Sequence, residues 1–425
     1  MENPLITREA VDQSRATINM AARANAPSTS AMSRTYQRAK RRTQEELGDR
    51  GLDALNPIEI IIPEYLNQFI ILDENILINN ANKRIFAFAS PFSLELLTQY
   101  PNEIAIDGTF NTAPRGFMQI FTIHVMVDHC AIPVIFALLP SKATENYVRV
   151  FQSVVLHLPN FMPARVMSDF ELSELNAVEQ VFPQSQKTGC NFHMGNAIFR
   201  KIQTLPQLNQ LYHVNEESRH KLRSFQALAF VPHDEVYTFF CILIEDFNYV
   251  EQPQILDLLR YFVLTWIGPS YVMQHPPIDP GQEDLNYGAN VDAWIRAWIV
   301  NENLQNRMAL FPIPLWNLTQ RIENGLSRSN NSLEAWHHVW SSLLSRRPRL
   351  SQFIKRMLKE YTRWEEIVRE FQNSPADGIR GKGIRRRAIY LNQDANLQQI
   401  YAEFEQRGQN PLQYLRTVSY RLARH

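Results

Sequence analysis

The feature that most constrains the fold of this 425-residue chain is a series of strand-like runs that gives way to alternating helices and short strands. Three apolar runs separated by turn residues predict an antiparallel meander. Each later helix must cross back over the sheet to add a parallel strand. The sequence therefore predicts an α/β fold with a mixed sheet covered by helices. The strands are predicted at 103–107, 117–127, 132–139, 164–167 and 185–192, and the helices at 144–158, from 168 and at 194–205.

Changes in the residue pattern divide the chain into six predicted regions. The first is polar and basic, without a sustained apolar period, and we expect it to be disordered. Short strands are expected at 58–62 and 69–72, and aromatic residues at helical spacing later predict an all-helical domain. The regions are a leader (1–56), an α/β lead-in (57–102), the first part of the sheet domain (103–205), the helical domain (206–320), a return to the sheet domain (321–372), and a basic linker with a C-terminal helix (373–425).

Composition excludes several classes of protein. Three cysteines cannot build a disulfide framework, which favours a reducing, intracellular context. No stretch of about 18 uncharged apolar residues exists, so a membrane-spanning protein is not expected. The 43 basic and 43 acidic residues cancel, but residues 1–50 carry a net +3 and residues 346–425 a net +9. The acidic middle could gather cations while the basic ends meet a polyanion, although charged surfaces also simply keep proteins soluble.

Two aspartates follow predicted strands. Asp107 ends the run 104–106 and Asp169 follows the strand 164–167. Taken alone, Asp107 before glycine suits a turn, and Asp169 suits the cap of a helix. A crossover helix, however, can place the second strand beside the first, so that both acids share one sheet edge. Burying a carboxylate at the end of a strand costs free energy unless a cation or several hydrogen-bond donors contact it.

Glu334 is the third candidate acid, near the edge of an apolar helical stripe that includes Leu333 and Trp336. A glutamate in the first turn of a helix is also favoured by the helix dipole alone. Three converging carboxylates would repel one another without divalent cations between them. Two Mg²⁺ ions about 4 Å apart could activate a water and stabilise the leaving oxygen of a phosphodiester.

Four sequence boxes resemble those of the Mutator-like element (MULE) transposases, in the family order. The first two hold Asp107 and Asp169, the third contains Cys190 and His193, and the fourth contains Glu334. No single box is decisive, but the ordered set is specific. The boxes are Ile104-Ala105-Ile106-Asp107-Gly108-Thr109-Phe110 with Phe117-Met118-Gln119-Ile120, Val166-Met167-Ser168-Asp169-Phe170-Glu171, Cys190-Asn191-Phe192-His193, and Asn330-Asn331-Ser332-Leu333-Glu334-Ala335-Trp336-His337.

This resemblance implies an RNase H-like catalytic domain, with the helical domain inserted before the glutamate and a helical C-terminal region. It implies a DDE-type transposase in which Asp107, Asp169 and Glu334 bind Mg²⁺ or Mn²⁺ for cleavage and strand transfer on double-stranded DNA at transposon ends. It further implies homo-oligomers and a nuclear location. Family members often carry an amino-terminal zinc finger, whereas no Cys/His finger precedes residue 57. A domesticated, non-catalytic DNA-binding protein and an unrelated metal-dependent nuclease are the alternatives.

His193 is implied by the resemblance to lie at the active site, in contact with DNA or the scissile phosphate; the alternative is a structural hydrogen bond. The spacing of Cys190 and His193 is half of a zinc site, but no second pair exists. Basic residues could neutralise DNA phosphates, or could simply form solvated helix faces. The candidate DNA-binding residues are Arg328, Arg346, Arg347, Lys355, Arg385, Arg386 and Arg387.

Overall fold

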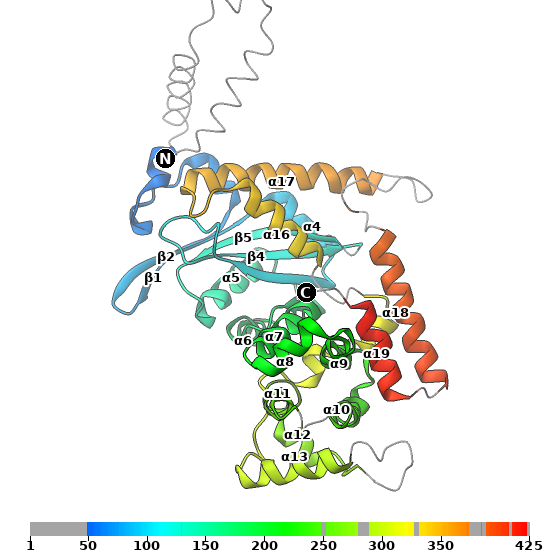
Figure 1. Cartoon of the computed structure of the whole chain (residues 1–425). Coiled ribbons are helices and arrows are strands. Elements are labelled where there is room, and N and C mark those ends of the chain that lie inside the picture. The colour runs from blue at the N-terminus through cyan, green and yellow to red at the C-terminus, as the bar shows by residue number, and fades with distance from the viewer. Residues whose placement is uncertain are drawn as a thin grey trace, which may run out of the picture.

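The structure, a computed structural model, describes residues 49–128, 130–247, 252–278, 289–326, 331–373, 384, 388–407 and 410–422. A sheet covered by helices and a separate helical part lie one above the other (Figure 1). Most of the predicted leader, 1–48, lies outside the described residues. None of the described helices is long and apolar enough to cross a membrane.

The sheet has seven strands in the order β1-β2-β5-β4-β3-β6-β7. The strands from β1 to β3 in this order pair antiparallel with one another. Strand β6 pairs parallel with β3, and β7 pairs parallel with β6, as the crossover argument predicts. The strands are β1 (Ile70–Ile78), β2 (Ala81–Ala89), β3 (Glu103–Thr109), β4 (Gln119–Val127), β5 (Cys130–Leu139), β6 (Arg165–Ser168) and β7 (Gln186–Gly189).

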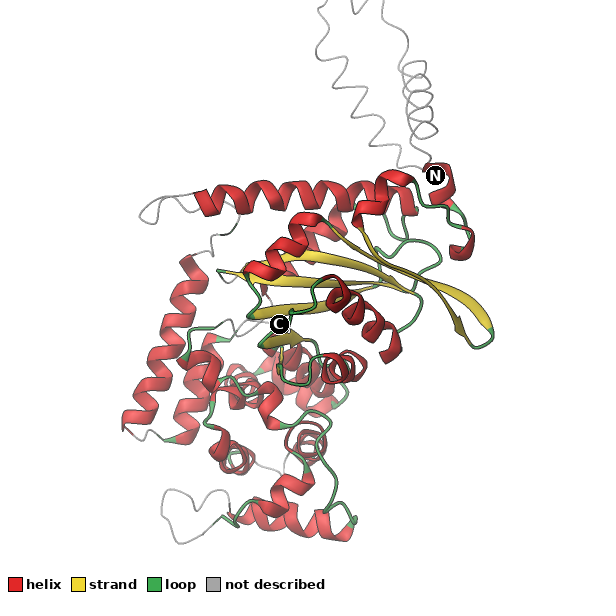
Figure 2. Ribbon diagram, turned by 180° about the vertical axis from the view of Figure 1, so that it is seen from behind, coloured by secondary structure: helices red, strands yellow, loops and turns green. Residues whose placement is uncertain are grey.

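Helices cover both faces of this sheet (Figure 2). Side chains alternate between the faces along a strand, so neighbours in sequence have different partners. Phe121 of β4 packs on Tyr147 and Phe151 on one face. Phe136 of β5 packs on Trp336 and other aromatic residues on the other face. The first face carries α5 (Thr144–His157) and α6 (Leu172–Val181), and the second carries α4 (Pro91–Gln99), α16 (Asn331–Leu343) and α17 (Leu350–Asn373).

The lead-in differs from prediction. The expected strand at 58–62 is wrong, because Asn56 caps a short 3₁₀ helix at Pro57–Glu59, where proline suits a first helical turn. Strand β2 was not predicted. Its polar first half ends in a fully buried run, so it lacks the simple alternation that marks a strand. A further 3₁₀ helix lies at Glu64–Phe69. The end of the predicted leader is not disordered, because Asp49–Asp53 form a 3₁₀ helix whose Leu52 is fully buried in the core.

Among the described residues of the predicted helical domain, 206–320, every regular element is a helix, as the aromatic spacing predicts. The helical part has its own core, which includes Trp266 and Trp316, both almost fully buried. Its helices are α7 (Asn191–Gln203), α8 (Pro206–Val214), α9 (Glu216–Ala227), α10 (Val236–Glu245), α11 (Gln254–Phe262) with a π-helical turn (Val263–Ile267), α12 (Pro269–Gln274), α13 (Ala289–Asn301), α14 (Ile313–Trp316) and α15 (Thr319–Glu323), with short 3₁₀ turns at Leu228–Phe230 and His233–Glu235.

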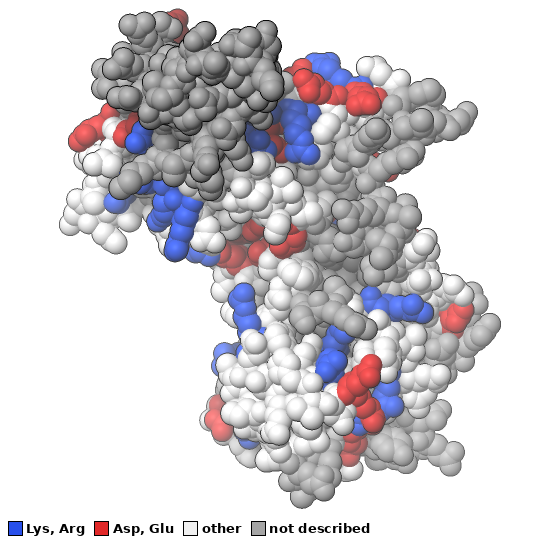
Figure 3. All heavy atoms as spheres, turned by 45° about the horizontal axis from the view of Figure 1, so that its top comes forward, with Lys and Arg blue, Asp and Glu red and all other residues white. Residues whose placement is uncertain are grey.

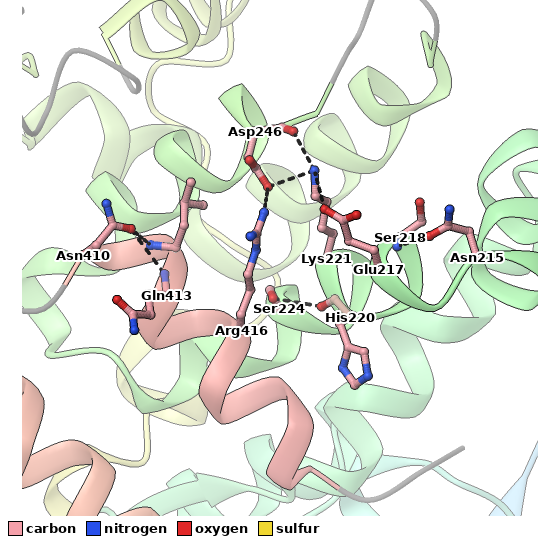
Figure 4. A network of polar contacts seen from close by, with 11 residues as sticks. Asn215, Glu217, Ser218, His220, Lys221, Ser224, Asp246, Asn410, Gln413 and Arg416 are labelled. Carbon is pink, nitrogen blue, oxygen red and sulfur yellow. Dashed lines mark hydrogen bonds and ion pairs between the residues drawn. The ribbon is translucent and has the colours of Figure 1, made fainter.

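Two C-terminal helices complete this core. They are α18 (Ala388–Arg407) and α19 (Pro411–Arg421), and both contribute buried residues to it. Arg416 of α19 pairs with Asp246, which also pairs with Lys221 of α9, each at about 3 Å (Figure 4). Tyr414 donates a hydrogen bond to the carbonyl of Phe230. The predicted C-terminal region therefore packs on the helical part rather than standing alone.

Candidate active site

Asp107 and Asp169 come level on neighbouring strands. The parallel register of β3 and β6 pairs Ile104 with Val166 and Ala105 with Met167. Two residues further along each strand are the aspartates, Asp107 inside β3 and Asp169 directly after β6. The topology thus brings together two acids that are 62 positions apart in the sequence.

The structure argues against the simpler local roles of both aspartates. Asp107 pairs with Thr122 in the β3–β4 ladder, so it lies within a strand rather than in a turn. The helix after Asp169 begins only at Leu172, with Glu171 at the N-cap position, so Asp169 does not cap it. Neither a turn nor a helix cap therefore accounts for the positions of these acids.

Helix α16 brings Glu334 to the same sheet edge. Leu333 is fully buried and packs with Ala105 and Met167, the residues that stand two positions before the aspartates. The hydroxyl of Ser332 accepts a hydrogen bond from the backbone N–H of Ala131, at 3.1 Å. These two contacts fix the start of the helix against β3, β5 and β6. Glu334 also lies in the first turn of α16, where the helix dipole favours a glutamate whether or not it has a further role.

Leu333→Ala should destabilise the protein by about 2–5 kcal/mol, because it leaves a cavity under the first turn of α16. The measurement is urea unfolding followed by tryptophan fluorescence. Leu343→Ala, on the same helix but 50% exposed, is the matched control and should change stability by less than about 0.5 kcal/mol. Equal effects of the two variants would contradict the anchoring role of Leu333.

His193 of α7 stands between two of the acids. Its Nδ1 lies 2.7 Å from Asp169 Oδ1, and its Nε2 lies 3.2 Å from Glu334 Oε1. Burial acts to lower the pKa of His193, but Asp169 and Cys190 outweigh it and raise that pKa to about 11. An imidazolium here offsets the repulsion between the carboxylates. Cys190, fully buried at the N-cap of α7, donates its backbone N–H to the Ser168 carbonyl.

His337 is a site residue that the sequence argument missed. It lies one turn after Glu334 on α16, and its Nε2 is 2.7 Å from Asp107 Oδ2. Asp107 and Thr122 are cross-strand partners, so their side chains share the sheet face that α16 covers. The signal was present as Glu334-x-x-His337, because residues three apart on a helix share one face.

A further buried carboxyl group, that of Glu174, lies close to the acids of the site. Glu174 of α6 is only 2% exposed, and burial, followed by the charges of Glu171, Asp169 and Asp107, raises its pKa well above the usual range. Burial likewise raises the pKa of Asp169 and of Glu334, with neighbouring acids adding to the effect. So many carboxyl groups favour either bound protons or a bound cation.

The chemical types of the side chains at the site fit a divalent metal, but their atoms do not converge on one point in this structure. Asp169 Oδ1 and Glu334 Oε1 are buried without a hydrogen bond of proper geometry. Carboxylate oxygens are the ligands of Mg²⁺ and Mn²⁺. Within the described part of the chain, no three Asp, Glu, His or Cys side chains converge as a ready metal site. The acids instead form close pairs with the imidazoles of His193 and His337.

The predicted DNA-binding residues have different settings. Arg346 and Arg347 are in the α16–α17 connection, but the guanidinium of Arg347 donates to the Phe117 carbonyl at 2.5 Å. Arg347 therefore has a structural bond in addition to its charge. Lys355 is half-buried on α17, and Arg328 and Arg385–Arg387 lie outside the described residues. Figure 3 shows acidic side chains gathered at the waist of the molecule, with basic side chains above and below them.

A comparison with protein-family models agrees with the first three sequence boxes. A comparison with curated proteins gave no match. Residues 103–197 match the family model of the MULE transposase domain, a segment that contains Asp107, Asp169 and His193 but ends before Glu334. This match confirms the predicted resemblance: residues 103–197 of the chain are similar to the MULE transposase domain.

Proposed function

We propose that this protein is a DDE-type DNA transposase that cleaves DNA and transfers strands at transposon ends with the help of a divalent metal. One observation carries the proposal: the sheet register and the anchored start of α16 bring Asp107, Asp169 and Glu334, from three distant segments, to one sheet edge. Counted from β3, the strand order is 3-2-1-4-5, which supports an RNase H-like core. The helical part would then be an insertion before Glu334.

Asp107, Asp169 and Glu334 would hold Mg²⁺ or Mn²⁺ through their carboxylates. When bound, such ions lower the pKa of a water nucleophile and offset charge on the phosphodiester. The acids are partly open to solvent, with side-chain exposures of 14%, 26% and 33%, so a ligand can reach them. His193 contacts both Asp169 and Glu334 and so positions their carboxylates. The proposal extends to a contact of His193 with DNA or the scissile phosphate.

Double-stranded DNA is the substrate in this proposal, and the exposed Arg346 would help to neutralise its phosphates. Arg347 contributes charge while its guanidinium remains bonded to the Phe117 carbonyl. The proposal extends to a nuclear location and to a homo-oligomer acting on paired ends. These parts rest on the MULE resemblance.

The test is conversion of supercoiled plasmid to nicked plasmid in Mn²⁺, with Glu334→Gln compared with the wild type. We expect Glu334→Gln to lower the rate at least ~100-fold, since it removes a charged ligand without changing side-chain size. Glu302→Gln, at an exposed position directly after α13, is the control and should keep the wild-type rate. Equal nicking by all three proteins would refute the catalytic role of Glu334.

Two outcomes separate the alternatives. An oligonucleotide with a free 3′-hydroxyl that becomes joined to the plasmid indicates strand transfer, whereas nicking without joining indicates a nuclease. DNA binding with no nicking in Mg²⁺ or Mn²⁺ would instead favour a domesticated, non-catalytic DNA-binding protein.

A further inference from the structure

His337 is placed as a ligand would be, although the MULE resemblance assigns it no role. His337 follows Glu334 by three residues on α16, so both face the same sheet edge. Its Nε2 lies 2.7 Å from Asp107 Oδ2. Its side chain is only 12% exposed. A Glu-x-x-His pair on one helix face is also the arrangement by which some helical metalloproteins hold their ions.

The ion pair with Asp107 leaves the hydrogen-bonding capacity of the His337 ring unsatisfied. Both ring nitrogens of His337 are buried, and neither has a hydrogen bond of proper geometry among the described residues. The short distance to Asp107 therefore joins two groups that face each other without an aligned N–H between them. Such a pair leaves its nitrogen lone pair and its carboxylate oxygen available to a third, positively charged partner.

The neighbouring histidine differs at its Nε2, although its Nδ1 is likewise buried without a hydrogen bond. His124 is fully buried, its ring centroid is 6.1 Å from that of His337, and its Nε2 is 3.0 Å from the hydroxyl of Thr122. Burial, and secondarily the charge of His337, lowers the pKa of His124 well below its usual value. His124 is thus a neutral, hydrogen-bonded core residue, whereas His337 faces an acid of the site.

We propose that His337 is a fourth metal ligand, which gives an imidazole nitrogen to the cation held by Asp107. The inference rests on the proposed function, because it adds a ligand to that metal site. A nitrogen donor favours Mn²⁺ and later divalent transition metals over Mg²⁺, which prefers oxygen ligands. The site is therefore of mixed nitrogen and oxygen character, and Mn²⁺ is the cation that fits it better.

The test is pulsed electron paramagnetic resonance on the full chain with Mn²⁺, which detects a ¹⁴N nucleus bound directly to the metal. The wild type should show ¹⁴N modulation of the Mn²⁺ echo. His337→Gln should lose that modulation and bind Mn²⁺ at least ~10-fold more weakly. His338→Gln, the exposed neighbour on the same helix, should keep both the signal and the affinity.

A rescue variant protects the test against misfolding. His337→Asp replaces nitrogen by oxygen, so it should regain metal binding, lack ¹⁴N modulation, and move the preference toward Mg²⁺. Circular dichroism checks that each variant is folded.

Other results would overturn the inference. Modulation that persists in His337→Gln but disappears in His193→Gln would assign the nitrogen to His193. Mn²⁺ binding and plasmid nicking without any ¹⁴N modulation would leave the proposed function intact and remove His337 from the ligand set. No Mn²⁺ binding by the wild type would overturn both the inference and the proposed metal site.

Discussion

A chain shortened to end at residue 387 should keep its sheet and lose the fold of its helical part. The deletion removes α19, which packs on α9 and α10, and α18, which packs on α19 and α15. Each large apolar side chain that they bury contributes about 1.5–3 kcal/mol, so their loss removes on the order of 10 kcal/mol. That is comparable to the entire stability of a typical domain. The residues are Leu397, Tyr401, Phe404, Tyr414, Leu415, Val418 and Leu422.

Hydrogen exchange read by mass spectrometry checks this expectation region by region. Amides of α9 and α10 should exchange rapidly in the shortened chain, while those of β3, β4 and β5 should stay protected. Adding a peptide of residues 388–425 should restore protection. The control is Tyr414→Phe, which loses only the hydrogen bond to the Phe230 carbonyl and should cost about 0.5–1.5 kcal/mol. Protection of α9 and α10 without α18 and α19 would contradict the packing argument.

The sheet was predictable where local pattern and topology agree. Turn residues and apolar runs predicted β3, β4 and β5, and the crossover argument allowed β6 to lie beside β3. The lead-in was less predictable. A short apolar run at 58–62 resembles a strand, but Pro57 and the Asn56 cap favour a helical turn there. The spacing of apolar residues also does not indicate which core a terminal helix joins. Only the structure shows that α18 and α19 pack in the core of the helical part.

The sequence argument predicted the acids of the site but missed some of the residues that contact them. Asp107 and Asp169 stood out because carboxylates at the ends of apolar strands need a reason. His337 did not, because a histidine beside Trp336 in a helix fits a core residue equally well. Only the β3–β4 pairing and the docking of α16 place it against Asp107. For the same reason the carbonyl bond of Arg347 was invisible in a basic run.

Asp169→Asn should reduce Mn²⁺-dependent plasmid nicking by about 10³-fold or more. The change keeps the shape of the side chain but removes a charge that would hold the metal, a loss of several kcal/mol in transition-state stabilisation. It also removes the carboxylate that pairs with His193, so that Glu334 is held less firmly. Both effects act on the reaction rather than on the sheet, which β3 and β6 hold through backbone pairing.

Asp128→Asn is the matched control for this prediction. Asp128 is exposed in the β4–β5 turn at a φ of 47°, a left-handed conformation that asparagine also tolerates. Its nicking rate should equal that of the wild type. Thermal unfolding followed by circular dichroism should show both variants folded, within about 4 °C of the wild type. If Asp169→Asn nicks plasmid at the wild-type rate while remaining folded, Asp169 does not hold the metal, and the shared sheet edge of the three acids has another purpose.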